Sequence, residues 1–116
     1  ISFVDVDLKA IKTNKINLFL NNLSIFDKVF KSKQIHKNFR KKKYYDVICA
    51  NIFLTQLKSL VKNFRYLVRK KGFLIISGIL NSQRSNFLNF YRKFSLYPIK
   101  ISEENCWSTI IFKKMK

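Results

Sequence analysis

Apolar positions along the 116-residue chain follow two alternating patterns. Short continuous apolar runs are typical of strands, and longer segments with apolar residues every three or four positions are typical of helices. The runs predict strands at residues 1–5, 26–31, 46–50 and 73–77. The periodic segments predict helices over residues 7 to about 22, 52–69 and about 82–94. The last strands, near 96–102 and 106–113, are joined by the residues SEEN and are expected to pair antiparallel.

Two of these runs favour strands inside a parallel sheet. DVICA (46–50) and FLIIS (73–77) are apolar at consecutive rather than alternate positions, so both are expected to be buried on both faces. The alternation of strands with helices is typical of a doubly wound α/β fold. The sequence therefore predicts a mostly parallel α/β sheet that ends in an antiparallel hairpin.

Several residues predict where these elements begin and end. Asp7 fits the N-cap of the first helix, and Asn21 and Asn22 fit the left-handed positions after its last turn. The second helix is expected to end at Lys70-Lys71-Gly72. Gly78 is expected to open the turn after the strand at 73–77.

Length and composition predict one domain of a cytoplasmic protein. Hydrophobic residues make up 47% of the chain, which excludes a disordered chain. No apolar run approaches the roughly 18 residues of a membrane span, and the first residues, ISFVDVD, do not resemble a signal peptide. Cys49 and Cys106 are far apart and lie among apolar neighbours, so we expect two reduced, buried thiols.

The net charge of +18 has two interpretations. It is typical of a surface that contacts nucleic acid. A drift in base composition explains it as well, because the chain is rich in Lys, Asn, Ile, Phe and Tyr, whose codons are rich in A and T. The densest basic stretch, KNFRKKKYY (37–45), carries no RNA-stacking motif and is expected to form a charged loop. His36 lies beside it without a second ligand, so no metal site is expected.

Two polar residues stand where predicted strands end. Ligands of doubly wound sheets bind at the carboxyl ends of the strands, where Asp5 and Asn51 are expected. The Asp5 carboxylate could accept the hydroxyls of a ribose, or it could help Asp7 to cap the first helix. Asn51 could likewise act at the crevice or cap the helix over 52–69. From these residues alone, both alternatives remain open.

The chain also resembles a known enzyme family. FVDVDLKAIKTNKINLFLNN resembles the second strand and helix of class I methyltransferases, and YYDVICANI resembles their fourth-strand motif. DVICANIFLTQL, GFLIISGILNSQRSNFLNFY and EENCW are similar, in this order, to the catalytic part of the bacterial methyltransferase of large-subunit ribosomal protein L eleven. The resemblance covers nearly the whole chain.

This resemblance implies a Rossmann-like sheet and S-adenosylmethionine as the cofactor. Asp5 falls on the family's ribose-binding acid, and Asn51 on an asparagine that contacts the cofactor and lies at the catalytic edge. The implied reaction is methylation of amino groups, on lysine side chains and the N-terminus, of ribosomal protein L eleven.

The chain departs from the family's pattern in its cofactor loop. The family binds the cofactor through a glycine-rich loop after its first strand, whereas this chain has only Gly72 and Gly78, neither in such a loop. Residues 1–116 are therefore expected to form a partial catalytic domain that lacks the first strand and the substrate-recognition domain, and to be inactive alone. The expected vacant strand position lies between residues 1–5 and 46–50. The alternative function is a small basic module that binds ribosomal RNA without catalysis.

Overall fold

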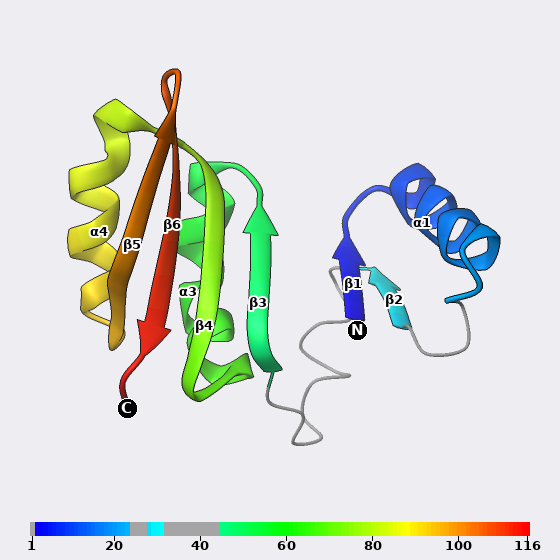
Figure 1. The fold of residues 1–116 in the computed structure, drawn as a ribbon, viewed down its shortest axis with the longest axis horizontal. Coiled ribbons are helices and arrows are strands. Elements are labelled where there is room, and N and C mark those ends of the chain that lie inside the picture. The colour runs from blue at the N-terminus through cyan, green and yellow to red at the C-terminus, as the bar shows by residue number, and fades with distance from the viewer. Residues whose placement is uncertain (1, 24–27, 32–44) are drawn as a thin grey trace. The chain divides into compact units, whose positions relative to one another are not determined.

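The computed structural model describes residues 2–23, 28–31 and 45–116 of the chain. The chain divides into two compact units, residues 1–42 and 43–116, and each is described by itself (Figure 1).

The first unit contains two parallel strands and one helix. Strands β1 (Ser2–Asp5) and β2 (Lys28–Lys31) pair with Val4 opposite Phe30, and helix α1 (Leu8–Leu20) follows β1. The helix buries Ile11 and Leu18. The strands at the start of the chain and within 26–31 are therefore confirmed, as is the helix between them.

Both ends of α1 are closed by the chain itself. Asp7 is its N-cap, and the Asp7 carboxylate accepts a hydrogen bond of 2.8 Å from the Lys9 N–H, as the sequence predicts. At the other end the Leu23 N–H donates to the Leu18 carbonyl at 2.8 Å, and Asn22 has a φ of 57°, which together form a Schellman motif. Asn21 has a φ of −97°, so only one of the two asparagines is left-handed.

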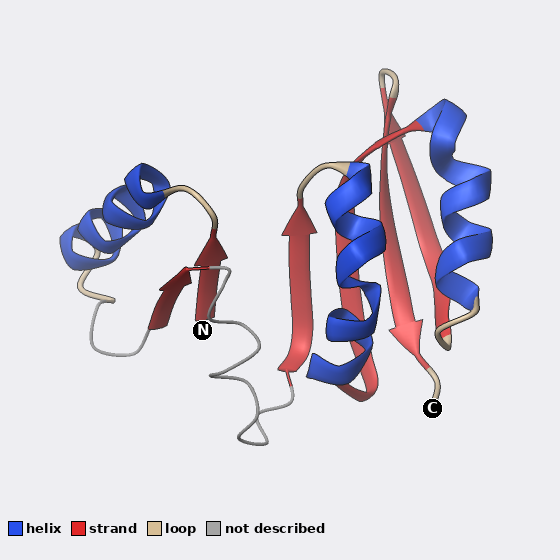
Figure 2. Ribbon diagram, turned by 180° about the vertical axis from the view of Figure 1, so that it is seen from behind, coloured by secondary structure: helices blue, strands red, loops and turns tan. Residues whose placement is uncertain are grey.

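The second unit is a four-stranded mixed sheet with helices on one face. Its sheet has the order β3-β4-β6-β5, in which β3 and β4 are parallel and the β4–β6 and β5–β6 pairs are antiparallel. Figure 2 shows α3 and α4 on the same side of this sheet. The elements in chain order are β3 (Tyr45–Asn51), α3 (Leu54–Leu67), β4 (Val68–Leu80), the short 3₁₀ helix η2 (Asn81–Gln83), α4 (Arg84–Arg92), β5 (Leu96–Glu104) and β6 (Trp107–Lys114).

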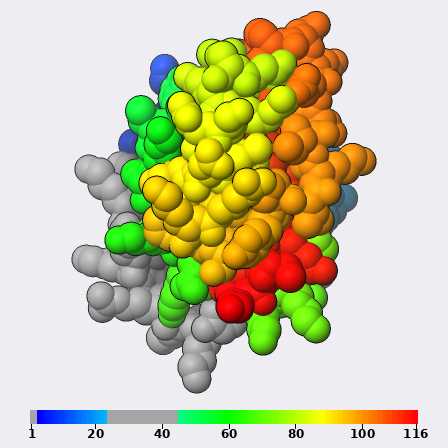
Figure 3. Space-filling model, turned by 90° about the vertical axis from the view of Figure 1, so that its left-hand side faces the viewer, coloured from blue at the N-terminus to red at the C-terminus, as the bar shows by residue number. Residues whose placement is uncertain are grey.

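Aromatic rings form the centre of the core between the helices and the sheet. Tyr91 of α4 stacks on Phe112 of β6 with ring centroids 5.1 Å apart, and Phe87 lies 4.2 Å from Tyr91. The Tyr91 hydroxyl donates a hydrogen bond of 2.7 Å to the Leu57 carbonyl of α3, and burial raises the pKa of Tyr91. This contact ties the two helices together. Figure 3 shows the outer face of α4, in yellow, beside β5, in orange.

The expected burial of residues 46–50 is wrong, although their parallel pairing is confirmed. Among the described residues β3 pairs with β4 alone and is an edge strand, and the Val47 side chain is 47% exposed. Strands β1 and β3 belong to different sheets. Cys49 and Cys106 are free thiols, as expected, but both are exposed because one lies on the edge strand and the other in a hairpin turn.

Three predicted element ends also differ from the structure. Helix α3 ends at Leu67, where the Lys114 ammonium donates to the Arg65 and Val68 carbonyls at 2.6 and 2.7 Å and satisfies its last turn. Residues 70–72 therefore belong to β4. Gly78 does not open a turn: it lies inside β4, at an irregularity between Ile76 and Ile79. The hairpin turn is residues 105–106, and the two glutamates of SEEN lie in β5.

Candidate active site at the carboxyl ends of β3 and β4

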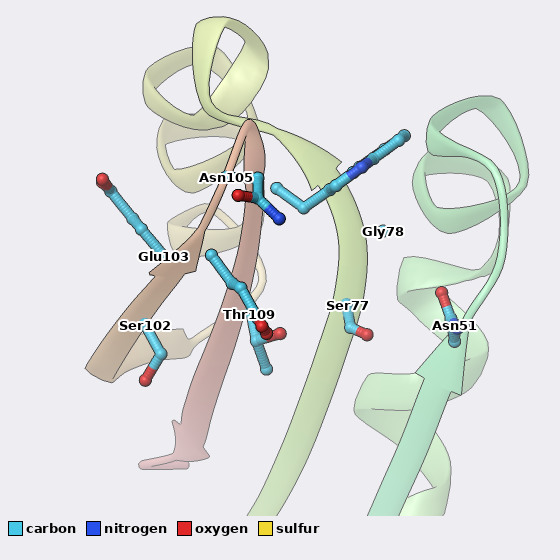
Figure 4. Close-up of a pocket in the computed structure, with 9 residues that line it drawn as sticks. Asn51, Ser77, Gly78, Ser102, Glu103, Asn105 and Thr109 are labelled. Atoms are coloured by element: carbon cyan, nitrogen blue, oxygen red, sulfur yellow. The ribbon is translucent and has the colours of Figure 1, made fainter.

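A row of polar side chains crosses the sheet of the second unit near the carboxyl ends of β3 and β4. Asn51 of β3 is in register with Ser77 of β4, and Ser102 of β5 is in register with Thr109 of β6 (Figure 4). The residues next to this row, such as Ile76 and Ile110, are fully buried in the core under the helices. Since side chains alternate along a strand, the polar row lies on the face that α3 and α4 do not cover.

An open pocket of about 640 Å³ lies along this row. Its volume is within the range of small-molecule sites, which runs from about 300 to 1,000 Å³. Besides the polar row, the β5–β6 hairpin contributes acidic and aromatic side chains. The lining residues are Asn51, Ser77, Gly78, Ser102, Glu103, Glu104, Asn105, Trp107 and Thr109.

The Asn51 side chain lies against the backbone of Gly78. A Cβ atom placed on Gly78 would lie 2.8 Å from the Asn51 Oδ1 atom, closer than side chains tolerate, and Gly78 has a φ of 83°. Glycine is the residue that fits both conditions, because it has no Cβ and adopts a positive φ without strain. The bulge in β4 thus makes the space that the Asn51 amide occupies.

Helix capping does not explain Asn51. The N-cap of α3 is Phe53, and among the described residues no side-chain hydrogen bond caps this end of the helix. The capping alternative is therefore wrong, and the amide of Asn51 faces the pocket.

Asn81 fixes the hairpin that forms the far wall of the pocket. Its side chain accepts a hydrogen bond of 2.5 Å from the Ser108 hydroxyl and donates one of 3.3 Å to the Asn105 carbonyl. Its backbone N–H donates to the Cys106 carbonyl at 2.9 Å. Ser108 is fully buried, and its hydrogen bond to Asn81 is partly buried. Sequence reasoning missed Asn81, and the available signal was an amide directly after the SGIL run.

Glu103 of the hairpin forms an ion pair with a residue of another element. Its carboxylate forms an ion pair with Arg84, the first residue of α4. This contact joins the hairpin to the helix that follows β4, so Glu103 has a structural partner of opposite charge.

Asp5 lies in the first unit, at the end of β1, and is exposed. Its Oδ1 atom accepts a hydrogen bond of 2.9 Å from the Asp7 N–H, so Asp5 does support the cap of α1. The ribose role stays a prediction. Asp5 and Asn51 belong to different units, and the pocket described above is built from the second unit alone.

Three expectations concern features outside this pocket. His36 and most of the basic stretch at 37–45 lie outside the described residues. Within the described ranges, no three potential ligand side chains are grouped to hold a metal ion. In the same ranges, none of the helices has the length and apolar character needed to cross a bilayer.

Comparison with known proteins agrees with this architecture. The profile of the family described as "Ribosomal protein L11 methyltransferase (PrmA)" matches residues 1–115. The chain belongs to the ribosomal protein L11 methyltransferase family. The predicted family and its class I methyltransferase fold are thereby confirmed.

Individual members of the L11 methyltransferase family align with nearly the whole chain. The protein of Hamiltonella defensa is 35% identical over 112 residues, which are 96% of this chain and 35% of that protein. The protein of Campylobacter lari is 32% identical over 112 residues, or 95% of this chain and 37% of that protein. The chain thus spans about a third of the length of these relatives.

The crystal structure of a ribosomal protein L11 methylase from Lactobacillus delbrueckii subsp. bulgaricus has a similar fold. It superposes with a TM-score of 0.86 at 17% identity, over 99% of this chain and 57% of the other. The elements described above are therefore part of the Rossmann-like methyltransferase fold, with a mixed sheet.

Proposed function

We propose that this chain carries catalytic residues of a cytoplasmic S-adenosylmethionine-dependent protein N-methyltransferase. Its substrates would be amino groups of ribosomal protein L11, on lysine side chains and the N-terminus. The observation that carries the proposal is the placement of Asn51. Its amide does not cap α3, it lies against the Gly78 backbone, and it lines the pocket at the carboxyl ends of β3 and β4. Family membership supplies the reaction class.

Asp5 is the residue that we propose to bind the ribose of the cofactor. S-Adenosylmethionine, when bound, supplies an electrophilic methyl group. One oxygen of the exposed Asp5 carboxylate accepts a hydrogen bond from the Asp7 N–H. A carboxylate can accept further hydrogen bonds, here from the ribose hydroxyls. The sequence offers no glycine-rich loop for the methionine part, so we propose that these 116 residues alone bind the cofactor weakly and are inactive alone.

The role proposed for Asn51 is to orient the amine that receives the methyl group. The Oδ1 atom can accept a hydrogen bond from an amine N–H and so hold the nitrogen lone pair in line for attack. The amine must lose a proton to react, and positioning then contributes more than a strong base would. The close approach of Gly78 to the Asn51 side chain suits this role, because a loosely held amide could not fix the direction of the lone pair.

The test is a hybrid protein in which this chain replaces the matching third of the Hamiltonella defensa relative. We expect the hybrid to transfer a radiolabelled methyl group from S-adenosylmethionine to purified ribosomal protein L11 and not to free ribosomal RNA. The relative itself is the positive control. A folded hybrid that binds the cofactor and methylates RNA instead, or transfers nothing, contradicts the proposal.

A basic pocket favours a second function, contact with ribosomal RNA. At the opposite end of the second unit, a cavity of about 500 Å³ is lined by Lys62, Arg65, Lys93 and Lys114 among others. Burial, together with the positive charge of Arg65, lowers the pKa of Lys114, whose ammonium is already bound to backbone carbonyls. The three remaining cations are the ones that could bind phosphate.

RNA binding has its own test. Each phosphate neutralised contributes about 0.7 to 0.9 to the slope of log affinity against log salt. Replacing Lys62, Arg65 and Lys93 by glutamine should therefore flatten the slope measured for an rRNA fragment by fluorescence anisotropy. An unchanged slope would show that this pocket is not the contact.

A further inference from the structure

Glu104 and Trp107 face each other across the tip of the β5–β6 hairpin. They are directly opposite partners in the antiparallel register, and both line the pocket that contains Asn51. Directly opposite residues point to the same face of a sheet, so both side chains leave the hairpin on the face that borders the pocket. The Trp107 side chain is 50% exposed, which leaves part of the ring open to a ligand.

The charge of Glu104 is not compensated in the same way as that of Glu103. Glu103 is paired with Arg84, whereas Glu104 forms no ion pair within the described part of the chain. The chain has 24 basic and only six acidic residues, so most of its surface repels a cation. A carboxylate beside an aromatic ring is the opposite environment, because both attract an ammonium group.

The position of this pair is fixed by the rest of the second unit. Asn81 binds the hairpin through the Ser108 hydroxyl and the Asn105 and Cys106 carbonyls. A rigid wall can define where a ligand amine sits relative to the opposite side of the pocket, where Asn51 lies.

We propose that Glu104 and Trp107 form the binding site for the protonated amine of the substrate, on the hairpin side of the pocket. The ammonium would lie between the carboxylate and the indole face, and the aliphatic part of a lysine side chain would pack on the ring. The pair selects a cationic amine, which must lose its proton to water before Asn51 can orient the nitrogen lone pair. This inference rests on the proposed function, since it names residues that recognise the substrate of that reaction.

A titration of the 116-residue chain tests the proposal directly. Trp107 is the only tryptophan, so intrinsic tryptophan fluorescence reports on this site alone. The probe is Nα-acetyl-lysine methylamide, and the comparison ligand is Nα-acetyl-norleucine methylamide, which lacks the ammonium. We expect a saturable change with the lysine probe, with a Kd on the order of millimolar for so small a ligand, and no saturable change with norleucine.

Two charge-matched variants locate the site. Glu104→Gln should weaken the lysine probe about fivefold or more, because a hydrogen bond to a charged acceptor is replaced by a neutral one. Asp46→Asn removes the same charge near the start of β3, where the exposed Asp46 carboxylate pairs with Arg69 at 2.7 Å. This variant should leave the affinity within about twofold, because the exposed pair is distant from the pocket and screened by solvent. Equal melting temperatures by circular dichroism confirm that both variants are folded.

Each outcome decides the proposal. Equal weakening by the two variants would mean that only the net charge of the chain matters. Equal binding of the norleucine ligand would mean that the ammonium is not recognised. Either result overturns the proposal, as does the absence of a saturable response. The binding test is separate from methyl transfer. A hybrid that methylates L11 although the chain ignores the lysine probe would refute this inference alone, and lysine binding without transfer would refute the proposed function alone.

Discussion

Substituting Gly78 by alanine should destabilise the second unit and displace the Asn51 side chain. Gly78 has a φ of 83°, and a left-handed backbone costs a residue with a Cβ atom about 1–2 kcal/mol. The new methyl group would also lie 2.8 Å from the Asn51 Oδ1 atom. Moving this amide off its preferred rotamer costs about 0.5–1.5 kcal/mol.

One effect opposes this loss. Alanine restricts the unfolded chain more than glycine does, which stabilises a protein by about 0.4–1 kcal/mol. The net expectation is a loss of about 0.5–3 kcal/mol, the difference between these contributions. For a domain of 60–100 residues, each kcal/mol lowers the melting temperature by about 4–8 °C.

The assay combines thermal denaturation with nuclear magnetic resonance of the Asn51 side-chain amide. Gly72→Ala is the matched control: its Cβ would lie 2.9 Å from the Asp46 and Arg69 carbonyl oxygens, so it should also destabilise, but without moving the Asn51 signals. A Gly78→Ala variant that melts at or above the original temperature would refute the reasoning. So would unchanged Asn51 amide signals.

Three further predictions concern the helix cap, the core and the cofactor. Asp7→Ala should destabilise α1 by about 1 kcal/mol, seen as faster amide hydrogen exchange in that helix, whereas Asp7→Asn, which keeps a capping oxygen, should change it little. Tyr91→Phe should cost about 1 kcal/mol, measured by urea denaturation, through loss of the hydrogen bond to the Leu57 carbonyl. Because burial raises the Tyr91 pKa, its contribution to stability is present below the unfolded-state pKa of about 10 and is lost as pH rises above it. Tyr91→Phe should therefore reduce the loss of stability above pH 10, and Tyr97→Phe, at an exposed ring, should not. Calorimetry should find S-adenosylmethionine binding to the 116-residue chain at millimolar levels or weaker, because Asp5 alone offers too few contacts; micromolar binding would contradict this.

Local signals predicted the elements of this fold well where the deciding contacts are close in sequence. The Asp7 cap and the left-handed Asn22 depend on residues within one turn of α1, and both are present. The continuous apolar runs at 46–50 and 73–77 also predicted parallel strands, and the structure pairs these two segments in parallel.

Burial was harder to predict, because it depends on neighbours rather than on the strand itself. Val47 and Cys49 have the apolar surroundings of a core strand in the sequence, but in the described part of the chain β3 is the edge of its sheet. The same limit applies to the end of α3. The Arg65 and Val68 carbonyls there accept hydrogen bonds from Lys114, which lies 49 and 46 positions later in the sequence.

The candidate site was predicted only in part for the same reason. The position of Asn51 at a strand end follows from the sequence, and its support by Gly78 requires a bulge that no local pattern reveals. Asn81 and Ser108 meet across 27 residues, so the hairpin wall could not be derived from spacing.

The central claim, that Asn51 orients the reacting amine, is tested most directly by single-turnover methyl transfer with the Asn51→Ala hybrid. An orienting contact at the reacting centre should be worth about a hundredfold in rate. We expect cofactor affinity to fall less than in Asp5→Ala, because ribose contacts act mainly on binding. A single-turnover rate equal to that of the unmodified hybrid, at saturating cofactor and with the melting temperature recorded on the same sample, would contradict the claim.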